Sequence, residues 1–103
     1  MAKEIIWSDE AKAWLSDIYD YLAQDNEKVA WNTVVGIREK AEVLVNNPNV
    51  GYRHDEDDLP YDVRILLYGH YRIAYEAIEG QDIKILGIFH GSLNMKRFLS
   101  RYH

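Results

Sequence analysis

The spacing of the apolar residues changes once along this chain of 103 residues, and that change constrains the fold more than any other feature. Up to Pro48 the apolar residues recur at steps of three and four, which is the period of one face of an α-helix. From Val63 onward they occupy alternate positions, which is the period of a half-buried β-strand. We therefore predict an α+β fold in which helices pack on a small antiparallel sheet.

Two apolar stripes in the first half predict two helices. Residues 3–7 favour a short N-terminal strand, and Ser8 after them has the chemistry of a helix N-cap. The first helix should end near Gln24 and the second before Pro48, and the short connection between them predicts an antiparallel helical hairpin. The residues predicted to face the core are Ala11, Trp14, Leu15, Ile18, Tyr21 and Leu22, then Ala30, Trp31, Val34, Ile37, Ala41, Leu44 and Val45.

Three segments in the second half alternate as strands do. The short stretches Gly69-His70 and residues 79–81 suit hairpin turns, so we predict a three-strand antiparallel meander packed on the helices. The second turn would place Glu76 opposite Lys84. The apolar positions predicted to face the helices are Val63, Ile65 and Leu67, then Tyr71, Ile73 and Tyr75, then Ile83, Ile85 and Phe89.

Two further segments lie outside this framework. Residues 49–61 have no sustained period and include the acidic run from Asp55 to Asp58, so we predict a surface loop. Residues 94–103 place apolar side chains at helical spacing among basic ones, and we predict a short C-terminal helix. A chain of this length leaves little room for a second core, so residues 1–103 are predicted to form one domain.

Composition argues against several classes of function. The net charge of −5 opposes a protein-wide attraction to nucleic acid, because phosphate binding depends on accumulated positive charge. The absence of cysteine excludes disulfides, a thiolate nucleophile and cysteine-ligated metals. No apolar run reaches the ~18 residues of a membrane span, and the first residues lack the pattern of a secretory signal. We therefore predict a cytoplasmic protein without a membrane partner.

No metal and no small-molecule cofactor is predicted either. His54, His70 and His103 have no metal-ligand spacing among themselves or with nearby acids. The glycines form no phosphate-binding loop, and no serine stands in a nucleophile-elbow motif.

Four basic side chains of the predicted strands form the candidate site. Arg64, Arg72, Lys84 and His90 alternate with the main apolar residues, so we predict that they share the sheet face away from the helices. Arginines could hold a phosphate while the histidine moves a proton near neutral pH, as phosphodiester cleavage would require. The alternative is that the arginines pair across strands with acids such as Glu76, and that His90 makes a structural hydrogen bond to the following turn.

Taken in order, these segments resemble the RelE/ParE superfamily, the toxins of bacterial type II toxin–antitoxin systems. The resemblance covers nearly the whole chain and depends on the order and spacing of several segments, not on one motif. The segments that carry it are Ala11 with residues 15–21, the break at 47–51, and residues 63–66, 71–75 and 85–94.

The ending HGSLN at residues 90–94 is more similar to the ParE branch, whose members are associated with poisoning DNA gyrase by binding. For this chain the resemblance implies the toxin of a plasmid-stabilisation-like system that inhibits DNA gyrase. It also implies a cognate antitoxin whose C-terminal segment wraps around the toxin and neutralises it.

The RelE branch implies an alternative, a ribosome-dependent endoribonuclease that cuts messenger RNA. Its catalytic residues here would be Arg72 and His90, with Arg53 and Arg64 as helpers. Residues 62–68 lack the lysines that some nucleases of this family carry on the first meander strand, and Ser92 or Leu93 replaces an arginine often found after the last strand. These departures and the acidic net charge favour the binding reading. A third alternative is a non-toxic relative kept as a partner-binding module.

Overall fold

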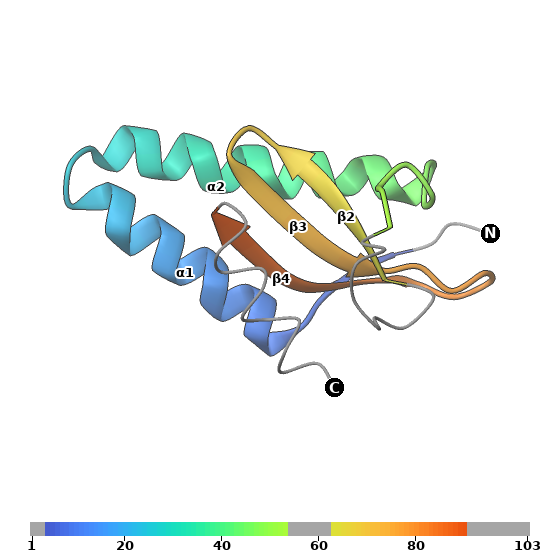
Figure 1. The fold of residues 1–103 in the computed structure, drawn as a ribbon. Coiled ribbons are helices and arrows are strands. Elements are labelled where there is room, and N and C mark those ends of the chain that lie inside the picture. The colour runs from blue at the N-terminus through green and yellow to red at the C-terminus, as the bar shows by residue number, and fades with distance from the viewer. Residues whose placement is uncertain (1–3, 54–62, 91–103) are drawn as a thin grey trace.

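Two helices and a four-stranded sheet make up the part of the chain that the structure, a computed structural model, describes: residues 4–53 and 63–90. Figure 1 shows the two helices side by side and antiparallel, with strands crossing in front of the second one. The elements in chain order are β1 (Ile5–Trp7), α1 (Asp9–Ala23), α2 (Glu27–Glu42), the 3-10 helix η1 (Val43–Val45), β2 (Val63–Tyr68), β3 (Tyr71–Glu76) and β4 (Ile83–His90). The predicted α+β class is confirmed.

Side-chain caps start both helices. The Ser8 Oγ accepts a hydrogen bond from the Ala11 amide at 3.0 Å, and the Asn26 Oδ1 accepts one from the Val29 amide at 3.1 Å. Such caps satisfy amide groups that have no partner in the first turn of a helix. The second helix tightens into η1 and ends before Pro48, where the missing amide hydrogen stops it. The predicted helical hairpin is confirmed.

The sheet has the order β1-β4-β3-β2 and is mixed. The β2–β3 and β3–β4 pairs are antiparallel, and Glu76 lies opposite Lys84 as predicted. Strand β1 instead runs parallel to β4, with Ile6 beside Lys84, so the prediction of an antiparallel sheet is wrong for this strand. The helical hairpin and two further strands separate β1 from β4 along the chain, and a connection of that length permits parallel pairing.

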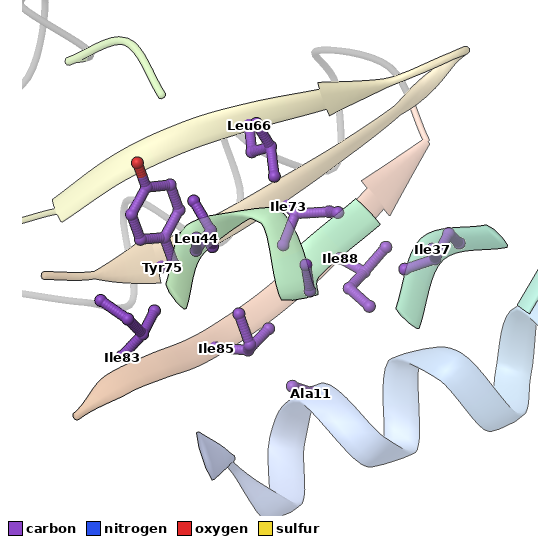
Figure 2. Close-up of a cluster of buried hydrophobic side chains, with 10 residues drawn as sticks. Ala11, Ile37, Leu44, Leu66, Ile73, Tyr75, Ile83, Ile85 and Ile88 are labelled. Atoms are coloured by element: carbon purple, nitrogen blue, oxygen red, sulfur yellow. The ribbon is translucent and has the colours of Figure 1, made fainter. Parts of the chain in front are cut away.

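The main core lies between the helices and one face of the sheet (Figure 2). Ile37 and Leu44 reach it from the helical side and Ile73, Ile85 and Ile88 from the sheet, all with 0% of their surface exposed. Burying apolar side chains of this size contributes about 1.5–3 kcal/mol each to folding. The full buried set is Ala11, Ile37, Ala41, Leu44, Leu66, Ile73, Tyr75, Ile83, Ile85 and Ile88.

The predicted inward face of β2 is wrong. Leu66 faces the helices, since it lies opposite Ile73, whereas Ile65 lies opposite Ala74 on the other face. Val63 and Ile65 are buried in a second cluster there, and Leu67 is 50% exposed. Apolar residues occupy both odd and even positions of this strand, so the pairing register chooses which set meets the helices.

The prediction that Phe89 faces the helices is also wrong, because β4 contains a bulge. Ala74 pairs with Gly87 and Tyr75 with Ile85, so Leu86 has no partner of its own across the β3–β4 pair. An extra residue of this kind reverses the alternation beyond it. Phe89, predicted to face the helices, therefore lies in the second cluster.

Two aromatic residues predicted to be in the core are exposed. Trp31 is 61% exposed and Tyr21 is 75% exposed, whereas Trp14 contacts the Phe89 ring edge-on with the ring centroids 5.2 Å apart. Helix α2 buries Ala30, Ile37 and Ala41 instead, a stripe that does not include Trp31. The apolar period predicted the position of the helix correctly, but it predicted more residues on the buried face than the structure buries.

Several predicted segments lie outside the described residues. They are the acidic run from Asp55 to Asp58, the HGSLN ending beyond His90, and the C-terminal helix at residues 94–103. Of the helices that the structure describes, none is long and apolar enough to cross a membrane.

Candidate functional site

Arg64 binds the backbone of the turn that follows the helices. Its Nη1 donates to the Gly51 carbonyl at 2.8 Å and to the Asn49 carbonyl at 3.4 Å. Arg64 lies opposite Tyr75 and therefore projects to the side of the sheet that carries the helices. Its guanidinium is engaged with carbonyl oxygens, which is a structural use of a charge predicted to be functional.

Tyr75 holds the same turn from inside the core. Its side chain is 0% exposed, and its hydroxyl accepts from the Gly51 amide at 2.9 Å and donates to the Pro48 carbonyl at 2.8 Å. Burial raises the pKa of Tyr75 above its ordinary value of 10.0, so the hydroxyl keeps the proton that it donates. The sequence pattern does not reveal this role, because nothing in the period of a strand distinguishes a tyrosine that binds a turn.

Gly51 is required where the turn meets this hydroxyl. A Cβ atom at this position would lie 2.6 Å from the Tyr75 Oη and 2.7 Å from the Ile65 carbonyl oxygen. The residue that follows, Tyr52, then exchanges two backbone hydrogen bonds with Ile65, at 2.9 and 2.8 Å. The turn therefore places Tyr52 beside the outer edge of β2.

Arg72 lies on the opposite face of the sheet from Arg64. It is paired with Leu67 on one side and Phe89 on the other. Its Nη1 donates to the Tyr52 hydroxyl at 2.9 Å. Arg72 is half-buried and Tyr52 is 39% exposed, so this predicted site residue keeps a polar, accessible partner that the sequence did not predict.

His90 lies on the helical side of the sheet, beyond the bulge. It is opposite Tyr71, and the two rings meet edge-on with centroids 5.2 Å apart. The His70 ring in the β2–β3 turn is 6.0 Å from the His90 ring. Burial raises the pKa of Tyr71, and the nearby Tyr21 adds to the effect.

The predicted cluster of four basic residues on one face is therefore wrong. Arg72 and Lys84 lie on the face away from the helices, whereas Arg64 and His90 lie on the face toward them. Lys84 is opposite Glu76, and Arg53 is exposed next to Tyr52. Simple alternation from Val63 onward cannot foresee either the register of β2 or the bulge in β4. Within the described ranges no three metal-ligating side chains gather either.

Two grooves run along α1, one on each side. The groove between α1 and α2, which we call the hairpin groove, has a volume of about 470 Å³. Its lining residues are Trp7, Lys12, Leu15, Ser16, Tyr19, Trp31, Val34 and Arg38. It is a cleft between two helical ridges with a largely apolar wall.

The second groove lies between α1 and the end of the sheet, and we call it the sheet groove. Its volume is about 330 Å³, and it has Asp17 and His90 as polar lining residues. The remaining lining residues are Trp14, Ile18, Tyr21, Leu22, Tyr71 and Ile88. The apolar period predicts neither groove, because it places Trp31 and Tyr21 in the core, whereas both are exposed. The signal in the sequence that indicates the grooves is the excess width of each apolar stripe.

Comparison with known proteins places this geometry in a family. The sequence profile of the ParE toxin of the type II toxin–antitoxin system parDE matches residues 5–95. A solved structure described as the chromosomal ParDE TA system from P. aeruginosa superposes with a TM-score of 0.71 at 26% sequence identity, covering 87% of this chain and 97% of that chain. No curated protein matches the sequence. Because the profile spans every described element and the solved structure shares their arrangement, the chain belongs to the ParE toxin family of type II toxin–antitoxin systems.

Proposed function

We propose that this toxin acts by binding DNA gyrase and that a cognate antitoxin neutralises it. Membership of the ParE family supports the gyrase target, because the resemblance of the chain is to the branch associated with gyrase. The similar ParDE structure supports the existence of an antitoxin partner. The protein would remain in the cytoplasm, where both partners act.

The single observation that carries binding over cleavage is that Arg72 and His90 lie on opposite faces of the sheet. A nuclease needs its phosphate-binding cation and its proton-transfer group on the same side of the scissile bond, within hydrogen-bond reach. Arg64 is also engaged, because its guanidinium binds the Gly51 carbonyl at 2.8 Å. Of the groups that the RelE alternative would use, Arg72 therefore lies on one face of the sheet, whereas Arg64 and His90 lie on the other.

The direct test is a supercoiling assay with purified gyrase and the purified toxin. We expect inhibition at stoichiometric toxin, and we expect the Arg72→Ala, His90→Ala double variant to inhibit as the unmodified protein does. Arrest of growth by induced toxin together with normal supercoiling in vitro would overturn the proposal.

Transcript ends mapped after induction decide the nuclease alternative in the same cells. Under the gyrase proposal, messages stay intact and the double variant remains toxic. New cleavage ends that disappear in the double variant would establish the endoribonuclease instead. Harmless expression of the chain alone would indicate the non-toxic relative.

A further inference from the structure

Two histidines that are far apart in the sequence meet at one end of the sheet. His70 closes the β2–β3 turn, and His90 is the last residue of β4, where it pairs with Tyr71. Figure 1 shows the β2–β3 turn and the end of β4 at the same end of the sheet. The two imidazole rings have their centroids 6.0 Å apart and their planes 56° from parallel. Strand register therefore brings together two nitrogen ligands that spacing along the sequence does not reveal.

The distance between the two rings suits a single metal ion. Zinc binds an imidazole nitrogen at about 2.0–2.1 Å, which puts the ion roughly 3.2 Å from the ring centroid. Two rings on one ion therefore have their centroids about 5.2 Å apart at a tetrahedral angle, and at most about 6.4 Å apart when the ion lies in line between them. The observed separation of 6.0 Å falls inside this range. Rotation of the two side chains can close the small remaining difference from tetrahedral geometry.

Both side chains are accessible, and the backbone that carries them is held in place. His70 and His90 are exposed, so an ion can reach them and the rings can turn to bind it. The two-residue turn at Gly69, with its φ of 57°, fixes the position of His70, and the Tyr71 ring contacts the His90 ring edge-on. Ligands that are already close together lose little freedom when they bind an ion. The site therefore requires no rearrangement of the fold.

The donor atoms select the class of metal. Imidazole nitrogen suits Zn²⁺, Ni²⁺ and Cu²⁺, whereas Mg²⁺ and Ca²⁺ take oxygen ligands. Asp17 lines the sheet groove together with His90, but within the described ranges no third ligand joins the two histidines. Two nitrogen ligands leave the other positions of a tetrahedral ion open to water.

We propose that His70 and His90 bind one Zn²⁺ ion between the β2–β3 turn and the end of β4. Each histidine supplies one imidazole nitrogen, and water completes the coordination. The ion links two segments of the folded chain that are far apart in the sequence, so its binding stabilises the fold. This site does not depend on the proposed binding of gyrase.

The test is calorimetric titration of the full-length protein with zinc chloride, with magnesium chloride as the control salt. We expect one zinc ion per chain, no binding of magnesium, and a thermal midpoint that rises with the zinc concentration. His70→Asn and His90→Asn should each lower the affinity for zinc at least about tenfold, because even groups that only orient a metal ligand contribute about 10–100-fold. The double variant should lose little more than either single variant, since the two residues share one ion.

The other two histidines of the chain provide the matched control. A His54→Asn, His103→Asn double variant should bind zinc as the unmodified protein does, and circular dichroism without metal would establish that every variant keeps the fold. Three outcomes would overturn the inference: no zinc binding at millimolar zinc, losses that add as for two separate sites, or an equal loss in the control variant. Supercoiling assays in zinc-free buffer test the gyrase proposal independently, so the two proposals fail separately.

Discussion

Arg64 and Arg72 lie on neighbouring strands of one sheet and have different surroundings. Arg64 donates to two carbonyl groups of a turn that the buried Tyr75 also holds. Arg72, on the other face, donates to the hydroxyl of an exposed tyrosine. The first arginine stabilises the turn, and the second makes one exposed side-chain hydrogen bond.

The difference teaches that the role of a basic residue depends on the groups near it more than on its place in an alternating pattern. A charged donor that binds a part-buried backbone carbonyl, as Arg64 binds that of Gly51, is costly to remove, because the carbonyl loses its partner. When a charged side chain that is hydrogen-bonded to an exposed phenol is removed, water takes its place as the donor, and the free energy of unfolding changes little. The two faces should therefore respond very differently to substitution.

The largest loss of stability is expected from Gly51→Ala, which adds a side chain in the turn that Arg64 and Tyr75 bind. The added Cβ would meet the Ile65 carbonyl oxygen at 2.7 Å, and backbone cannot move aside as a side chain could. We expect a loss of about 2–3 kcal/mol in the free energy of unfolding, measured by urea denaturation. Gly80→Ala is the control, because its φ of 81° costs about 1 kcal/mol but nothing lies within 4 Å. Equal losses would mean that the close approach at Gly51 is unimportant.

Tyr75→Phe should cost about 1–3 kcal/mol near neutral pH, because the buried Gly51 amide loses its acceptor while the ring still fills the core. The pKa of Tyr75 is raised in the folded state, so its contribution is complete below the unfolded value of 10.0 and is lost as pH rises toward the folded pKa. Urea titrations at neutral pH and above pH 10 should show the gap between wild type and variant narrowing at the higher pH. A constant gap would contradict this account; Tyr52→Phe, which removes an exposed hydroxyl, is the control.

The smallest changes in the free energy of unfolding are expected from substituting the two arginines, which tests the comparison directly. Arg64→Ala should cost about 1–2 kcal/mol, because two carbonyl groups of the turn lose a charged donor. Arg72→Ala should cost about 0.5 kcal/mol or less, because its hydrogen bond is exposed. Thermal denaturation of the two variants under one set of conditions measures the difference. If Arg72→Ala proves as costly as Arg64→Ala, the contrast between the two faces disappears.

The candidate site was only partly predictable from the sequence. The strands that carry Arg64, Arg72 and His90 were identified, and so was the pairing of Glu76 with Lys84. The sheet faces on which these side chains lie could not be predicted, because β2 has apolar residues at both odd and even positions and β4 contains a bulge. The grooves beside α1 also escaped prediction, since a pattern of apolar residues does not distinguish a side chain in the core from one in an open cleft.

The sequence by itself determined the α+β class, the cap at Ser8, the end of the second helix before Pro48 and the turn at Gly69-His70. These features follow from local chemistry, namely side-chain capping, the missing proline amide and the positive φ of 57° that a glycine accepts. The tertiary structure alone decided the parallel pairing of β1, the faces of β2 and β4, and the separation of the two arginines. These depend on register between segments far apart in the chain, and a shift of one residue there turns every side chain to the other face.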